Sequence, residues 1–87
     1  MVTDLQANLG INVYPNPSTD KTLVRWNAGL QPDAVELWDL QGRLIESFKT
    51  SAEFNEQVID LSAQTQGVYL IRVLKNGYER LEKVVKQ

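Results

Sequence analysis

Cysteine and histidine are both absent from this 87-residue chain, and each absence removes a class of function. Without cysteine there is no disulfide, no thiolate metal site and no thiol nucleophile. Without histidine the chain lacks the usual general base and the commonest metal ligand. The eleven Asp and Glu residues are scattered, without the alternating spacing of a calcium loop. We therefore predict no enzyme activity, no metal site and no cofactor.

Long apolar runs are missing as well. No stretch of 18 apolar residues occurs, so we expect no membrane-spanning helix. The first six residues lack the basic-then-apolar profile of a secretory signal. We interpret residues 1–9 as a linker or the end of an upstream segment. Residues 10–87 are expected to form one domain, because a chain this short cannot divide its core and keep either half stable.

The charge of the chain is small in total but unevenly distributed. The net charge of −2 gives no general basis for nucleic-acid binding, so we predict no nucleic-acid partner. Residues 1–71 carry a net charge of −5, whereas residues 72–87 carry five basic and two acidic residues. Two interpretations of this basic segment stay open. It is either a solvated edge strand protected by its charge or a docking strand for a receptor.

The hydrophobic pattern is short and period-two, with turn residues every eight to twelve positions. This pattern predicts an all-β antiparallel sandwich of about seven strands. Only residues 62–66 could form a turn of helix. Whether so small a sandwich dimerises through an open edge strand stays undecided. The expected strands are residues 10–14, 21–27, 34–39, 43–49, 54–61, 67–74 and 79–86.

The last two strands should form a hairpin around Asn76-Gly77, because both residues tolerate the positive φ of a tight turn. A two-residue loop would place the charged Arg80 opposite the apolar Val73. A loop one residue longer would instead pair Val73 with Leu81, leaving only Lys83 out of place. Since register usually follows the buried face, we predict the longer loop.

The two tryptophans are expected to differ in role. Trp26 is in phase with Val24 and fits the middle of a small sandwich. Trp38 is out of phase with its apolar neighbours and is the better candidate for an exposed or interfacial aromatic. If both were exposed on one sheet, they could form a sugar-binding platform. The chain would then be a carbohydrate-binding accessory module, or a spacer, and this alternative stays open.

Three residues have structural interpretations of their own. Asp39 and Asp60 close strands, where aspartate typically bonds the nearby turn backbone. Tyr69 starts the penultimate strand and could bond its hydroxyl back to the preceding crossover, as in a tyrosine corner.

Several stretches, taken in order, form a distinctive set within about residues 11–87. They are Val13-Tyr14-Pro15-Asn16-Pro17, Leu37-Trp38-Asp39-Leu40-Gln41-Gly42-Arg43, Ile59-Asp60-Leu61-Ser62, Gly67-Val68-Tyr69-Leu70-Ile71-Arg72-Val73 and Lys83-Val84-Val85-Lys86-Gln87. In order and spacing they resemble the type A C-terminal sorting domain of type IX secretion substrates.

The resemblance implies an immunoglobulin-like sandwich at the end of a larger exported cargo protein. It implies two partners, an outer-membrane secretion translocon and a sortase-like peptidase that removes the domain. It also implies that the cargo passes the periplasm and outer membrane of a Gram-negative bacterium and becomes secreted or displayed at the cell surface. With neither signal peptide nor cargo present, we expect this chain to be an excised domain.

The family's sorting-signal residues can be placed residue by residue, and the basic last strand with its terminal carboxylate is the expected contact. Carried over to this sequence, they are Pro15, Asn16, Pro17, Asp39, Gly42, Gly67, Tyr69, Lys83, Val84, Val85, Lys86 and Gln87.

Overall fold

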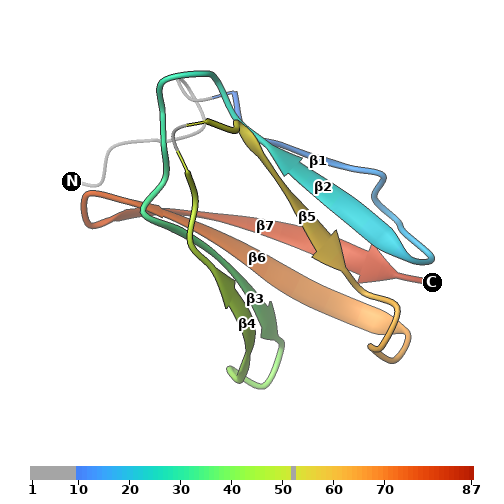
Figure 1. Ribbon diagram of the computed structural model, residues 1–87. Coiled ribbons are helices and arrows are strands. Elements are labelled where there is room, and N and C mark those ends of the chain that lie inside the picture. Colours follow the sequence, from blue (N-terminus) through green and yellow to red (C-terminus); the bar gives the residue numbers. More distant parts are fainter. Residues whose placement is uncertain (1–9, 52) are drawn as a thin grey trace.

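The computed structural model describes residues 10–51 and 53–87. The linker expected over residues 1–9 lies outside the described residues. Seven strands are present in the described part (Figure 1): β1 (Asn12–Tyr14), β2 (Lys21–Arg25), β3 (Ala34–Asp39), β4 (Leu44–Phe48), β5 (Glu56–Asp60), β6 (Gly67–Lys75) and β7 (Tyr78–Lys86). Among these residues, no helix is long and apolar enough to cross a membrane.

The strands form two antiparallel sheets that face each other. One sheet has three strands in the order β1-β2-β5, and the other has four in the order β4-β3-β6-β7. The predicted seven-stranded all-β sandwich is thereby confirmed. β3 has the predicted bounds, β1, β2, β4 and β5 are shorter than predicted, and β6 and β7 are each one residue longer. Residues 62–66 form a turn instead of a helix.

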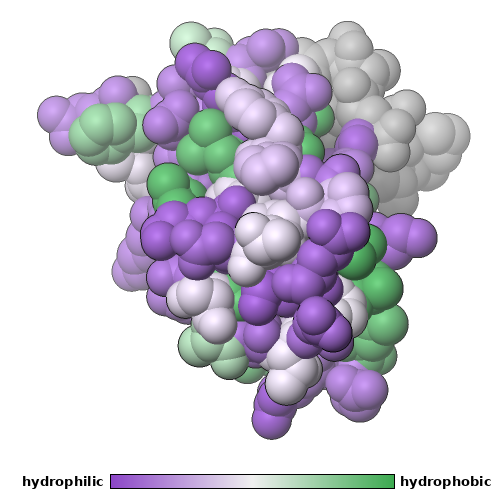
Figure 2. Space-filling view, turned by 90° about the vertical axis from the view of Figure 1, so that its right-hand side faces the viewer, coloured by the Kyte–Doolittle hydropathy of each residue, from purple (hydrophilic) through white to green (hydrophobic). Residues whose placement is uncertain are grey.

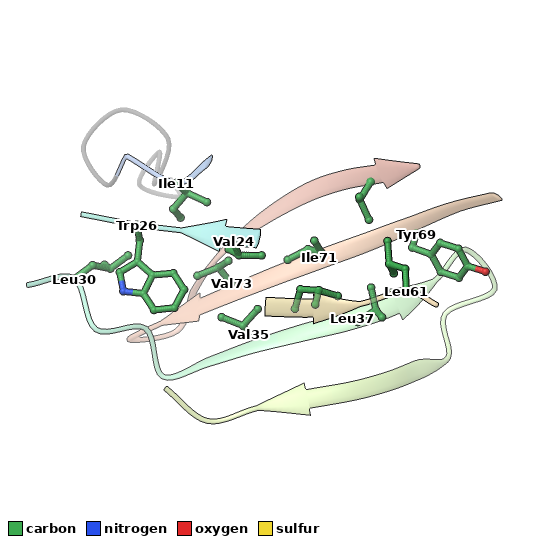
Figure 3. Close-up of a cluster of buried hydrophobic side chains, with 12 residues drawn as sticks. Ile11, Val24, Trp26, Leu30, Val35, Leu37, Leu61, Tyr69, Ile71 and Val73 are labelled. Carbon is green, nitrogen blue, oxygen red and sulfur yellow. The ribbon is translucent and has the colours of Figure 1, made fainter. Parts of the chain in front are cut away.

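The core lies between the sheets, as Figure 3 shows. It is built from alternate residues of β3 and β6, together with single hydrophobic residues from β2, β5 and β7 and several residues that flank the strands. Trp26 is only 3% exposed, which confirms its predicted place in the core. In β6, Tyr69, Ile71 and Val73 all point inward and are buried. Fully burying one such side chain contributes about 1.5–3 kcal/mol. Among the described residues, the buried hydrophobic core consists of Ile11, Val24, Trp26, Leu30, Val35, Leu37, Ile59, Leu61, Tyr69, Ile71, Val73 and Val84.

The predicted register of the last hairpin is wrong. Val73 pairs with Arg80, so the loop has two residues, Asn76 and Gly77. Both adopt positive φ, 51° and 82°, which is the geometry that a two-residue turn needs. Turn geometry therefore decided the register. The inward charge is accommodated because the Arg80 guanidinium pairs with the Glu82 carboxylate at 2.6 Å, on a strand at the edge of the sheet.

Candidate functional site

The motif residues singled out in the sequence meet at one end of the sandwich, which we call the motif end. It consists of the loop 15–18, the turn 39–43, the crossover 62–66 and residues 83–87, which are the end of β7 and Gln87. Strand pairing brings Tyr69 opposite Asp39 and Gly67 opposite Lys86. The opposite end, the hairpin end, carries the Asn76-Gly77 turn (Figure 1). Figure 2 looks onto the motif end and shows a largely hydrophilic surface.

Asn16 joins the first of these segments to the last. Its side-chain Oδ1 accepts a hydrogen bond from the Val85 N–H at 3.0 Å, and its Nδ2 donates to the Lys83 carbonyl at 2.8 Å. One side-chain amide thus satisfies a donor and an acceptor on the outer edge of β7. A residue of a neighbouring parallel strand would make the same pair of bonds through its backbone N–H and C=O, and the adjoining Ser18–Lys86 bridge is parallel. Asn16 therefore acts as a substitute strand for the end of β7.

Ser18 continues this contact along the same edge. Its N–H donates to the Val85 carbonyl and its carbonyl accepts from the Gln87 N–H, both at 2.8 Å. The Ser18 hydroxyl, buried in the structure, donates to the Lys21 carbonyl at 2.7 Å. The last residues of β7 are consequently bound to a segment that precedes them by 67 residues or more in the sequence.

The loop 15–18 is itself held down on β2. The buried Thr22 hydroxyl donates to the Pro15 carbonyl at 2.9 Å. Pro15 and Pro17 have no N–H, so Asn16 and Ser18 are the loop's only backbone donors. Both prolyl bonds, Tyr14-Pro15 and Asn16-Pro17, are cis. Sequence reasoning missed the anchoring roles of Ser18 and Thr22, although a serine directly after two prolines is a usual turn signal.

The turn 39–43 is closed by Asp39, as predicted. Its Oδ1 accepts from the N–H groups of Gln41 at 3.0 Å and Arg43 at 2.9 Å. Its Oδ2 pairs with the Arg43 Nε at 3.1 Å. Gly42 has a φ of +87°, a conformation that side chains rarely adopt. Asp39 and Gly42 therefore shape this turn.

The crossover 62–66 is fastened from both sides. The Tyr69 hydroxyl donates to the Thr65 carbonyl at 2.6 Å, which confirms the predicted tyrosine corner. Asp60 Oδ1 accepts from the Ser62 N–H at 2.9 Å. Hydrogen bonding from the Ser62 side chain and backbone lowers the pKa of Asp60. A cleft of about 360 Å³ lies between this crossover and the turn 39–43, lined in part by Asp39, Gly67 and Tyr69.

The basic charge at the end of the chain is largely engaged within the domain. Arg72 pairs with Glu79 at 2.5 Å and with Glu36 at 3.3 Å, and these carboxylates, Glu79 first, raise the pKa of its guanidinium. The Lys86 ammonium donates to the Gln64 carbonyl at 3.1 Å. Lys83 is exposed, and no described residue contacts its ammonium group by a hydrogen bond or ion pair.

The five terminal motif residues consequently have different environments. Val84 is fully buried in the core, and the side chains of Val85 and Lys86 are half-buried. Lys83 and Gln87 are exposed. The motif thus combines one core residue with side chains that reach the surface.

Trp38 is half-buried on the outer face of the four-stranded sheet, opposite Leu70. Its indole N–H donates to Glu36 Oε1 at 3.0 Å. Because Trp26 lies in the core, the two tryptophans do not form an exposed platform. Within the described ranges, no group of three or more acidic side chains could hold a metal ion.

A family model described as secretion system C-terminal sorting domain matches residues 12–87. No curated protein matches the chain.

Proposed function

Because this chain belongs to the family of secretion system C-terminal sorting domains, we propose that its motif end is the surface that the type IX secretion machinery recognises. The resemblance seen in the sequence is confirmed at the level of the family. A domain of this family is a sorting signal on a larger cargo protein. The cargo is exported to the surface of a Gram-negative bacterium or secreted from it.

The finer steps are part of the same proposal. The domain acts as a non-catalytic recognition module that directs its cargo through the outer-membrane translocon. A sortase-like peptidase then removes it at the cell surface, by cleavage within or before residues 1–10. The motif residues serve as the signal in two ways. Asp39, Gly42 and Tyr69 shape the motif end, while exposed groups on the loop 15–18 and on Lys83 make contact.

The observation that carries this proposal is the binding of the first motif to the last. The Asn16 side chain spans Lys83 and Val85 with bonds of 2.8 and 3.0 Å. Residues 83–87 are therefore presented as part of a folded surface and not as a free tail. Such a surface displays the opening and closing motifs together, and both must be intact for it to form.

The test is display of a reporter fused in front of the complete chain and carrying an export signal. We expect surface display in a host with a type IX secretion system, and none in the same host without its translocon. Asn16→Ala should reduce display several-fold. Asn55→Ala is the matched control, because it removes an asparagine bond to the Trp26 carbonyl (3.1 Å) at the hairpin end.

Comparable melting temperatures for the two variants would show that the effect of Asn16→Ala is not a loss of folding. Equal display of the two variants would refute the motif end as the recognised surface. Point variants are preferable to deletion of residues 83–87, because that deletion also removes the buried Val84 side chain from the core.

A further inference from the structure

The outer edge of β7 is only partly covered. β7 is the last strand of its sheet, so one of its edges has no neighbouring strand. The backbone groups of Val85 point to that edge, where they bond Asn16 and Ser18. Because backbone groups alternate sides along an antiparallel strand, Lys83, Leu81 and Glu79 direct their N–H and C=O to the same edge.

A run of these groups is left open. Asn16 takes the Lys83 carbonyl, and the loop 15–18 extends no further along the strand. Within the described residues, no hydrogen bond is made by four of these groups. They are the Lys83 N–H, the Leu81 N–H, the Leu81 carbonyl and the Glu79 carbonyl. An edge of this kind can pair with an added strand.

The outward side chains on this open stretch of β7 combine an exposed apolar group with an unpaired positive charge. Leu81 is 50% exposed. Lys83 is the one charged side chain of β7 for which the described residues supply no partner. Glu79 pairs with Arg72, Arg80 with Glu82, and Lys86 bonds the Gln64 carbonyl. On the outer face of the sheet, an added strand would therefore lie beside the apolar Leu81 side chain and, two positions further along β7, beside the unpaired Lys83 ammonium group.

The inward side of the same stretch restricts what can be added. Arg80 and Glu82 point inward and pair with each other, with side chains 14% and 30% exposed. Inward-pointing charges on an edge strand disfavour indiscriminate pairing with apolar strands. A strand that fits here needs polar side chains on its inner face.

We propose that an extended segment of the secretion machinery adds to β7 along residues 79–83, with an acidic residue opposite Lys83 and an apolar one opposite Leu81. This inference rests on the proposed function and names how the partner is bound. Main-chain hydrogen bonds supply affinity in such strand addition, and alternate side chains supply specificity. The loop 15–18 ends the binding site on the C-terminal side, since it already occupies the edge beside Val85.

Leu81→Pro tests the edge directly. The Leu81 N–H faces away from β6, so proline removes an outward donor and leaves the β6–β7 hydrogen bonds in place. We expect display of the reporter to fall about tenfold, because that factor corresponds to about 1.4 kcal/mol, comparable to one main-chain hydrogen bond. Leu81→Thr keeps the N–H and should retain most of the display. Equal display of Leu81→Pro and the unmodified chain would overturn the inference, as would equal losses in both variants.

Lys83 provides a second test, which remains decisive if Leu81→Pro does not fold. Lys83→Glu should reduce display several-fold with an unchanged melting temperature, and Lys83→Arg should retain it. Full display of Lys83→Glu would contradict an acidic partner residue. If the unmodified chain itself is not displayed, the proposed function fails and this inference fails with it. If the unmodified chain is displayed and the edge variants match it, the inference fails together with the contact assigned to Lys83, while Asn16→Ala still tests the motif end as the recognised surface.

A second copy of the chain is the competing occupant of the edge. Sedimentation of the purified 87-residue chain should show a monomer. A concentration-dependent dimer that Leu81→Pro abolishes would mean that β7 pairs with itself, and would overturn the assignment to the secretion machinery.

Discussion

At the hairpin end β7 starts from a two-residue turn braced by neighbouring loops, whereas at the motif end it finishes against a loop from the opposite part of the sequence. The bracing contacts at the hairpin end include Asn76 N–H to Asp33 Oδ2 at 2.8 Å and the Lys75 ammonium to the Gln31 carbonyl at 3.0 Å. These two contacts connect one turn to another, and neither bonds the backbone at the edge of β7. At the motif end, Asn16 and Ser18 bond that edge itself.

Similar hydrogen bonds therefore have different roles at the two ends of the sandwich. Contacts at the hairpin end stabilise the fold. Contacts at the motif end also stabilise it, and in addition they build a surface from segments far apart in the chain. Substitutions at the hairpin end should therefore lower reporter display only as far as they unfold the domain. Substitutions at the motif end that alter exposed groups should lower display beyond their effect on stability.

The largest expected effect is at the hairpin end. Trp26→Ala should reduce the free energy of unfolding by about 3–5 kcal/mol, because it removes a large core side chain and leaves a cavity. Urea denaturation followed by circular dichroism measures this loss, and Trp26→Phe should lose much less. Display should follow the folded fraction. A displayed yield well below the folded fraction would contradict the expectation that substitutions at the hairpin end lower display only by unfolding the domain.

Tyr69→Phe probes a motif residue that we assign to the fold. Removing the hydroxyl leaves the Thr65 carbonyl without this donor, so we expect a loss of about 1–2 kcal/mol in unfolding free energy. Tyr78→Phe, at an exposed tyrosine of the hairpin end, is the matched control and should change little. Display of Tyr69→Phe should remain near that of the unmodified chain. A strong display defect with a small stability loss would instead make the Tyr69 hydroxyl part of the contact surface.

Gly77→Ala tests the turn that sets the register of β7. The φ of +82° suits glycine, so alanine should destabilise the domain by about 1 kcal/mol. Gly77→Asn should recover much of this loss, because asparagine tolerates positive φ. Thermal melts of the three proteins measure the difference. No loss in Gly77→Ala would mean that turn geometry does not control the register.

The smallest expected effect is the contribution of Asp60 to the stability of the domain at acidic pH. Hydrogen bonds from Ser62 lower the pKa of Asp60 in the folded domain. A lowered folded pKa adds stability that is present above the unfolded value of about 4 and is lost as pH falls through the folded value. Asp60→Asn should therefore show a weaker decline in melting temperature as the pH is lowered below about 4. Identical declines in both proteins would exclude a contribution of Asp60.

Much of the fold could be predicted because burial alternates along strands such as β2, β3 and β6. The bounds of β3, the core position of Trp26 and the Tyr69 hydroxyl bond all follow from local spacing. The register of the last hairpin could not be predicted from burial alone. The inward Arg80 is stabilised by its ion pair with Glu82, and the turn residues determined the pairing.

The sequence by itself determined the fold class and the family, because both depend on patterns and motifs that are ordered along the chain. Only the tertiary structure decided that Asn16 covers the edge of β7 beside Val85, and that the Lys83 ammonium group has no partner among the described residues. The physical reason is distance along the chain. A hydrogen bond between residues 69 positions apart depends on which loop the packed sheets bring to which edge.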